Sequence, residues 1–266
     1  MSNKRMGRSI ARRPARGLLG LALAGCTVLG LASPSGAEAP TPSTSDKWGV
    51  ISRNTIGSPS AFLRDGPFGR TSTDPSARQS PPYGQGSLQL IVGDGTEKIA
   101  FGNETNFDGL RLANINTLTY WVFAGMDSLT GIALPGVYLE VDPNLTPEVN
   151  YSSLVYLPGD STTPSSPGTP LPNVWQRYNA STTNSAWYAT GATGSAIGCT
   201  LATPCSFSEL KSRLPDAEVT YSLGITKGRD TAFIGAVDGL QVNNLVYDFE
   251  RLGVFTKAPL PTQQTG

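Results

Sequence analysis

Apolar residues recur at every second position through much of the chain between residues 47 and 253, which is the period of a half-buried β-strand. Leu88, Leu90 and Val92 form one such run. Comparable short runs follow at intervals, separated by segments rich in glycine, proline, asparagine and aspartate. This pattern predicts an all-β protein, folded as a two-layer antiparallel β-sandwich of the jelly-roll kind.

Two runs indicate where the core lies. The segment 117–123 is apolar on both faces at its end, which predicts a central strand. In the segment 218–225, four side chains alternate with polar or small residues, so we expect them to share the core face. These four are Val219, Tyr221, Leu223 and Ile225.

The segment 232–250 predicts the closing hairpin of the sandwich. Asn243 and Asn244 suit a two-residue turn, because asparagine accepts positive φ better than other non-glycine residues. Such a turn places residues that pair across the two strands on the same face. Because these residues are apolar, a second sheet must cover that face. The pairs are Val242 with Leu245 and Leu240 with Tyr247.

A single short helix is expected near residues 206–214. Ser206 and Glu209 have the spacing of a capping box. Leu210 and Leu214 lie on one helical face, and Pro215 ends the helix.

The first 39 residues have the pattern of a signal peptide. Six basic residues precede an apolar run at 18–32, and Ala37-Glu-Ala39 offers a cleavage site. The run is too short and too rich in glycine to predict a membrane span. We therefore expect an extracellular protein with a linker at 40–46, one sandwich domain at 47–253 and a flexible tail at 254–266. Alternatively, Leu23-Ala-Gly-Cys26 resembles a lipobox, which would anchor the protein through a lipid on Cys26 at the outer face of the cell membrane.

Removal of the signal peptide makes the protein mildly acidic. The whole chain has 20 basic and 20 acidic residues, and the loss of the six basic ones leaves 14. Nucleic acid and anionic lipid surfaces are therefore excluded as expected partners, because both require a basic face. The sequence gives no indication of oligomeric state.

Two cysteines remain after processing, Cys199 and Cys205, with five residues between them. In an oxidising compartment, such a pair is expected to form a disulfide. Free buried thiols are the alternative.

The chain contains no histidine. This absence excludes Ser-His-Asp and Cys-His catalytic sites as well as metal sites that use histidine. No glycine-rich phosphate-binding loop is present either. We expect no enzymatic activity.

Carboxylates are the remaining route to catalysis. The run 137–142 turns Tyr138, Glu140 and Asp142 to one side of a strand. Family 16-type β-glucanases carry a Glu-x-Asp-x-x-Glu run on a sandwich strand, but Leu145 occupies the third acid position here. A glycoside hydrolase that uses Glu140 and Asp142 is an alternative function, in which a distant acid would complete the pair.

Aromatic residues stand in a stretch rich in asparagine, serine and threonine. Flat aromatic faces beside amides and hydroxyls are suited to stacking on sugar rings, which makes this stretch a candidate binding platform. A structural role is the competing interpretation, and for Trp175 and Trp187 we favour it, because tryptophan is usually buried. The candidates are Trp175, Arg177, Tyr178, Trp187 and Tyr188, together with Tyr138, Glu140 and Asp142.

We expect no cofactor, with calcium as an open alternative. Five aspartates stand in turns or at strand ends, where secreted sandwiches often hold calcium through oxygen ligands. No EF-hand spacing occurs, and capping of turns explains the same positions, so the metal content is not assigned. The five are Asp94, Asp108, Asp142, Asp238 and Asp248.

Several short motifs occur in an order similar to that of a widespread group of uncharacterised secreted bacterial β-sandwich domains. The resemblance covers residues 48–252 and implies a jelly-roll related in architecture to carbohydrate-binding modules and concanavalin-like domains. The group carries no established catalytic residues. The motifs are G-S-L-Q-L at 86–90, L-E-V-D at 139–142, W-Q-R-Y at 175–178, W-Y at 187–188, L-P-D-A at 214–217, and V-D-G-L-Q-V with Y-D-F-E within 237–250.

Together these features predict a secreted, non-catalytic binding or surface-interaction module. A polysaccharide or cell-wall glycan is the ligand class that we expect. The alternatives are the glycoside hydrolase described above and a structural cell-envelope protein without a small ligand.

Overall fold

The structure is a computed structural model that describes residues 42–43, 47–126 and 133–259. The predicted signal peptide, including Cys26, lies outside the described residues, as does most of the predicted tail. Within the described part of the chain, no helix is long and apolar enough to cross a membrane.

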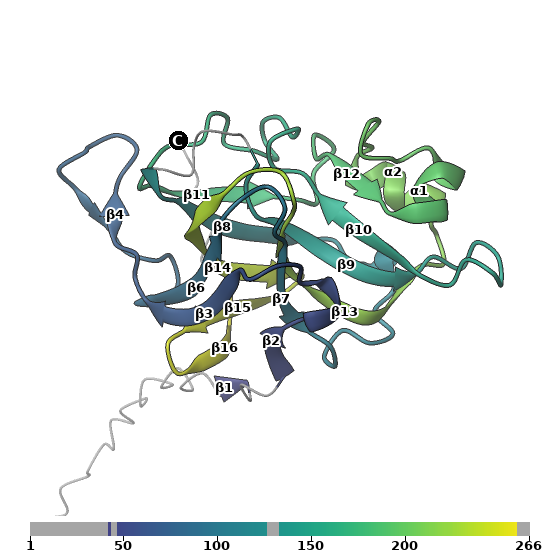
Figure 1. Cartoon of the computed structure of the whole chain (residues 1–266), viewed down its shortest axis with the longest axis horizontal. Coiled ribbons are helices and arrows are strands. Elements are labelled where there is room, and N and C mark those ends of the chain that lie inside the picture. Colours follow the sequence, from purple (N-terminus) through teal and green to yellow (C-terminus); the bar gives the residue numbers. More distant parts are fainter. Residues whose placement is uncertain (1–41, 44–46, 127–132, 260–266) are drawn as a thin grey trace, which may run out of the picture. The chain divides into compact units, whose positions relative to one another are not determined.

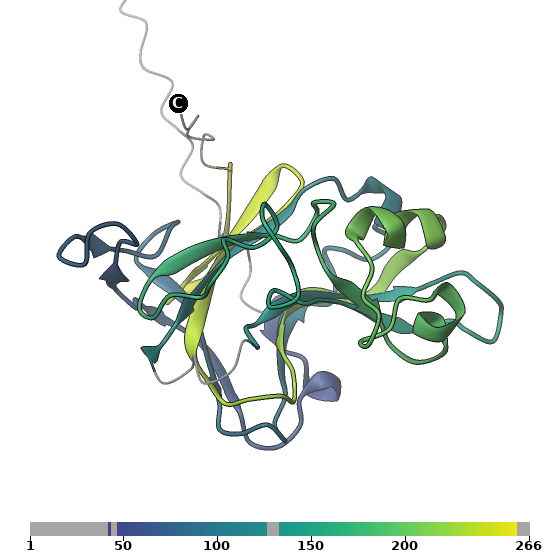
Figure 2. The same ribbon diagram turned by 90° about the horizontal axis from the view of Figure 1, so that it is seen from above.

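Two antiparallel sheets pack against each other, which confirms the predicted sandwich (Figures 1 and 2). The larger sheet has eight strands, and β14 pairs with three of its neighbours, β6, β8 and β15. Its strands are β1 (Pro42–Ser43), β3 (Ser60–Asp65), β6 (Gly86–Val92), β8 (Leu118–Ala124), β11 (Trp175–Asn179), β14 (Phe233–Val242), β15 (Leu245–Glu250) and β16 (Gly253–Lys257).

The second sheet has six strands in the order β12-β10-β9-β13-β7-β2. A small two-stranded sheet and two short 3₁₀ helices lie in the connections. The six strands are β2 (Trp48–Val50), β7 (Ile99–Asn103), β9 (Gly136–Asp142), β10 (Ser152–Tyr156), β12 (Trp187–Ala189) and β13 (Glu218–Lys227); the other elements are β4 (Gly69–Arg70), β5 (Arg78–Gln79) and the 3₁₀ helices Ser52–Asn54 and Leu112–Asn114.

The core between the sheets contains the alternating apolar side chains predicted from the sequence. Leu88, Leu90 and Val92 of β6 are fully buried. Strand β8 is central, as expected, because it pairs with β11 on one side and β14 on the other. Burial of such side chains contributes about 1.5–3 kcal/mol each, so this shared core holds the two sheets together.

The closing hairpin has the predicted register. Leu240 pairs with Tyr247 and Val242 with Leu245, and Asn243 adopts the expected positive φ of 54°. Leu240, Val242 and Tyr247 are buried, but Leu245 is 42% exposed. Leu245 directly follows the turn, so the covered part of this face ends before it reaches that side chain.

The expectation that Tyr221 shares the core face is wrong. Pairing between β13 and β9 shifts register between Val219 and Leu223, which marks a β-bulge. The bulge places extra residues on β13, so Tyr221 leaves the core and is 50% exposed. The other three side chains of that set are buried as predicted.

Strand pairing extends beyond both predicted limits of the sandwich. Strand β16 extends the sandwich to Lys257, four residues beyond the predicted limit, because Val254 packs in the core and β16 pairs with β15. Pro42 and Ser43, in the predicted linker, pair in turn with β16. Pairing of this kind satisfies backbone groups that an edge strand would leave open.

Two helices, one of them unpredicted, lie near β12 and β10 (Figures 1 and 2). The expected helix is α2 (Phe207–Arg213), and the capping box of Ser206 and Glu209 is formed. Helix α1 (Gly191–Ile197) was not predicted, because its sequence holds two glycines and no apolar stripe.

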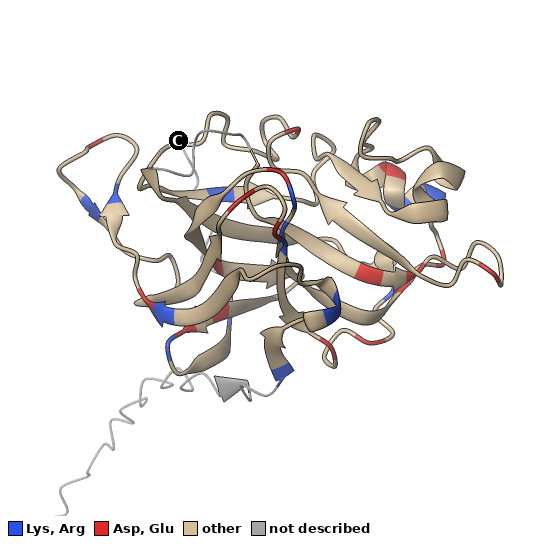
Figure 3. Ribbon diagram, in the orientation of Figure 1, with Lys and Arg blue, Asp and Glu red and all other residues tan. Residues whose placement is uncertain are grey.

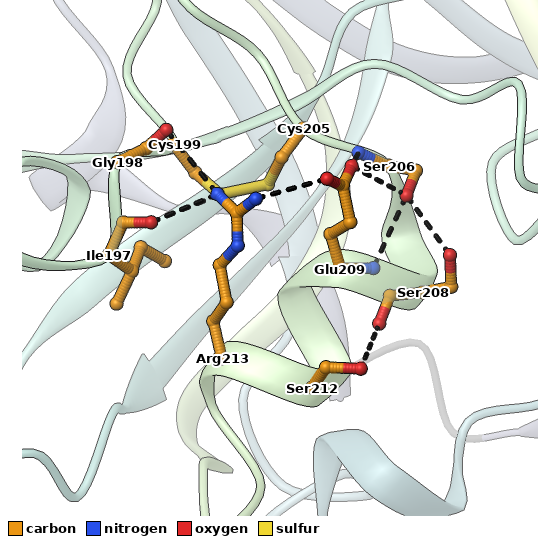
Figure 4. Close-up of polar contacts among 9 residues, drawn as sticks. All are labelled: Ile197, Gly198, Cys199, Cys205, Ser206, Ser208, Glu209, Ser212 and Arg213. Carbon is orange, nitrogen blue, oxygen red and sulfur yellow. Dashed lines mark hydrogen bonds and ion pairs between the residues drawn. A yellow bond between two sulfur atoms is a disulfide. The ribbon is translucent and has the colours of Figure 1, made fainter.

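The predicted disulfide joins Cys199 to Cys205 in the segment between the two helices. Figure 4 shows Arg213 of α2 reaching the disulfide. Arg213 donates to the sulfur of Cys199 at 3.2 Å and to the carbonyl of Ile197 at 3.0 Å, and it also pairs with Glu209. The disulfide closes this loop, and the polar contacts of Arg213 hold the loop against α2.

We predict that replacement of both cysteines, in C199S/C205S, lowers the free energy of unfolding by about 2 kcal/mol, because a short covalent loop restricts the unfolded chain. Denaturant unfolding under oxidising conditions measures the difference. A reductant should destabilise the parent protein by a similar amount and leave the double variant unchanged. Equal stability of the two proteins under oxidising conditions would contradict this role.

Candidate functional site

A groove of about 290 Å³ opens on the face of the six-stranded sheet that points away from the core. Its position follows from strand alternation: Leu139 and Leu154 point into the core, so their neighbours Tyr138 and Val155 point outward. The floor consists of Ala100, Tyr138, Val155 and Thr226, from β7, β9, β10 and β13.

Loops and the edge strand form the walls of the groove. Tyr188 of β12 is partly exposed and lines it, and Leu201, at 62% exposure, reaches it from the disulfide loop. The segment 157–160 and the turn 228–230 contribute the remaining sides. The groove therefore combines an apolar floor with a polar rim, the composition common to ligand-binding sites.

Glu140 lies beside the groove on the same outer face and is fully buried under other side chains. One carboxylate oxygen accepts hydrogen bonds from Arg53 and from Tyr151, the latter at 2.6 Å. The other accepts from Arg53 and from Ser222. Arg53 also pairs with Glu104, so one guanidinium bridges two carboxylates.

This network keeps Glu140 ionised. Burial alone would raise the pKa of Glu140, but the hydrogen bonds from Arg53, Ser222 and Tyr151 outweigh that effect and hold the pKa below its ordinary value. A carboxylate with both oxygens engaged and a lowered pKa is poorly suited to donate a proton. Its role in this geometry is to hold Arg53 and Tyr151 in place.

Two exposed tyrosines extend the face beyond the groove. Tyr151 and Tyr221 are 42% and 50% exposed, and their ring centroids lie 5.6 Å apart at an angle of 70°. The Arg53 guanidinium lies 5.6 Å from the centre of the Tyr221 ring. The Tyr151 hydroxyl is 3.1 Å from Ser153, which lines the groove, so the tyrosine pair and the groove are continuous.

The structure brings three of the sequence candidates to this face: Tyr138, Glu140 and Tyr188. Asp142 is on β9 as well, but its carboxylate accepts from the backbone of Asn144 at 2.9 Å and caps the turn that follows. Trp187 points the opposite way from Tyr188, into the core, and its indole donates to the carbonyl of Ala180 at 2.7 Å.

The remaining candidates lie on β11 of the other sheet. Trp175 is 2% exposed and its indole donates to the carbonyl of Pro67 at 3.0 Å. Tyr178 is buried in the core, whereas Arg177 is exposed and donates to Thr119. Both tryptophans are buried, in agreement with the structural role that the sequence favoured for Trp175 and Trp187. Neither ring is available as the alternative binding platform.

A second group of buried charges lies on the outer side of the eight-stranded sheet. Asp238 and Asp248 are fully buried, and the charge of Asp248 acts on Asp238. Asp238 accepts from the backbone of Tyr83 and of Phe249, each at 3.1 Å, and Asp248 pairs with Lys257 at 2.6 Å. These contacts tie the loop before β6 and the last strand to the sheet.

Burial raises the pKa of both carboxyls. The pKa of Asp248 rises to about 6, a shift that the ion pair with Lys257 limits. Burial and the neighbouring charge of Asp248 raise the pKa of Asp238 as well. Burial and mutual repulsion thus disfavour ionisation of both carboxyls at once.

Metal ligands do not gather in the described residues: no group of three or more histidine, cysteine, aspartate or glutamate side chains there could hold an ion. Of the aspartates considered for calcium, Asp94 accepts from the backbone and hydroxyl of Thr96, as a turn cap does. Lys and Arg are scattered among the elements in the view of Figure 3 and do not gather on one of them.

Comparisons of the chain with protein-family models, curated proteins and solved structures found no match. The resemblance to secreted jelly-roll domains therefore stays a prediction.

We predict that Glu140→Gln lowers the free energy of unfolding by about 2–3 kcal/mol at pH 7, because it removes the buried charge that Arg53 pairs with. Glu104→Gln removes an exposed partner of the same arginine, 52% exposed, and should cost less than about 1 kcal/mol. Denaturant unfolding of both variants and of the parent protein at pH 7 measures these differences in the free energy of unfolding.

The effect of Glu140→Gln should also depend on pH. Since the folded-state pKa of Glu140 is lowered, its stabilisation is present above the unfolded value of about 4.3 and is lost as the pH falls below it. If Glu140→Gln and Glu104→Gln lowered the free energy of unfolding equally at pH 7, the special role of Glu140 would be contradicted.

For the buried aspartate pair we predict the opposite dependence of stability on pH: the free energy of unfolding falls as the pH rises. Because the pKa of folded Asp248 is raised to about 6, ionisation destabilises the native state as the pH rises from about 4 to 6. Relative to Asp248→Asn, the parent protein should lose on the order of 2 kcal/mol across this window. Asp65→Asn, at an exposed ion pair, is the control and should show no comparable change; a constant difference between parent and Asp248→Asn would refute the prediction.

Proposed function

We propose that this protein is a secreted, non-catalytic binding module and that the outer face of its six-stranded sheet binds a glycan. The supporting observation is the continuity between the groove and the exposed Tyr151–Tyr221 pair. The face thus joins an apolar-floored cavity to open aromatic rings.

Sugar rings suit such a face for a physical reason. Their axial C–H groups form apolar patches that pack on aromatic rings, while their hydroxyls require hydrogen-bonding partners at the edges. Tyr188, Tyr151 and Tyr221 supply partly exposed rings. Ser153 and Thr226 line the groove on the same face and carry hydroxyl groups, so both halves of a sugar surface would find partners.

Export is supported by the basic and apolar pattern of residues 1–39. The Cys199–Cys205 disulfide fits the same compartment, since disulfides persist in oxidising environments.

The state of Glu140 supports binding rather than hydrolysis. A retaining or inverting glycosidase needs one carboxyl that donates a proton and a second that remains accessible. Glu140 is buried, ionised and hydrogen-bonded through both oxygens, and Glu104 pairs with the same Arg53. These contacts would have to break before either carboxylate could act.

A glycan array with the mature protein, followed by calorimetry on the hits, tests the proposal. Tyr188→Ala and Tyr221→Ala should each weaken binding by about tenfold, the loss expected for one aromatic contact of about 1–1.5 kcal/mol. Phe62→Ala is the matched control, because Phe62 is an exposed aromatic residue on the opposite sheet, at 44% exposure.

Circular dichroism and the unfolding midpoint should show that all three variants remain folded. Absence of binding to every glycan class, or binding that neither tyrosine variant weakens, would overturn the proposal.

A further inference from the structure

The groove carries two cations whose charges are not neutralised. Lys98 lies immediately before β7, half-buried at the groove, and Arg229 stands in the turn between β13 and β14. Among the residues that the structure describes, neither side chain has a hydrogen-bonded or ion-pair partner. Burial lowers the pKa of the Lys98 amine; the charge of Glu140 opposes this shift and the charge of Arg229 adds to it.

The acidic groups nearby are already engaged or lie in water. Asp230 accepts from Lys227 and from the backbone of Thr231. Glu140 is enclosed by Arg53, Tyr151 and Ser222. Asp160 stands exposed at the rim. A half-buried ammonium close to a second cation therefore lacks an anion, and such a site favours a ligand that supplies one.

We infer that the groove recognises a glycan carrying an isolated carboxylate, in the form of a uronic acid within an otherwise neutral chain, and that Lys98, with Arg229, pairs with this carboxylate. The inference rests on the proposed glycan-binding function and names the chemistry of its ligand. Two cations above an apolar floor match one anionic group attached to a mostly uncharged body.

The overall charge of the protein favours a sparse rather than a dense anion. After removal of the signal peptide, acidic residues outnumber basic ones, 19 or 20 to 14. A polyanion would be repelled by this excess beyond the groove, whereas a single carboxylate interacts only over short range. The side chains of Ala100 and Val155 in the floor have no polar group that could bind additional charges of a ligand.

The test uses the mature protein and xylo-, galacto- and manno-oligosaccharides that bear one glucuronic acid. Each is paired with its carboxyl-reduced counterpart, which has the same ring and no charge. Calorimetry should show at least tenfold tighter binding to an acidic member than to its reduced partner, and the difference should shrink when salt is raised from about 50 to 500 mM.

Variants at Lys98 distinguish charge recognition from a structural effect. Lys98→Met keeps the apolar stem and should abolish the preference, so that the affinities for the acidic and the reduced sugar become equal. Lys98→Arg should restore part of the preference. Lys47→Met, at an exposed lysine outside the groove, is the matched control and should change neither value.

The possible results separate this inference from the function on which it rests. Equal binding of acidic and reduced sugars, or a preference that survives in Lys98→Met, overturns the uronic acid inference and leaves glycan binding intact. Absence of binding to the acidic, the reduced and all arrayed glycans overturns both.

Discussion

The structure depends on one constraint: each strand of the six-stranded sheet must bury every second side chain against the other sheet. On β9, this requirement takes Val137, Leu139 and Val141 into the core. It consequently turns Tyr138 and Glu140 outward, because adjacent side chains of a strand point to opposite faces. The groove floor is thus a result of how the core is packed. Substitutions that shift the register of β9 would move the whole set of outward residues to the core.

Burial of the Glu140 carboxylate on the outer face is unfavourable, and the surrounding residues offset this desolvation. Removing Glu140 from water is unfavourable unless charged and polar groups replace the lost hydration. Arg53, Tyr151 and Ser222 do so. The same contacts hold the exposed ring of Tyr151 beside that of Tyr221. Stability and the shape of the candidate binding face are therefore coupled through one side chain. The aspartate pair on the other sheet instead serves the attachment of β16.

Strand periodicity predicted the sandwich and the central position of β8, because both follow from local alternation. Two short motifs predicted the rest: the Asn243-Asn244 turn gave the hairpin register, and the spacing of Ser206 and Glu209 gave the capping box of α2. Strand periodicity also placed Tyr138 and Glu140 on one outward face. Tyr221 was misplaced because a bulge in β13 depends on pairing with β9, which no local pattern records. Tyr151 was missed for another reason: the strand at 152–156 was not assigned, although Tyr151, Ser153 and Val155 alternate in the outward phase. The position of Lys98 at the groove depends on tertiary contacts, which the local sequence pattern does not record.

An NMR titration of the isotope-labelled mature protein with an oligosaccharide that it binds tests the location of the site most directly. If the outer face of the six-stranded sheet is the binding surface, the largest amide shifts will fall on Ser153, Val155 and Thr226 and on the turn at 228–230. Shifts concentrated on β11 around Trp175 and Arg177, with the groove residues unchanged, would contradict that location.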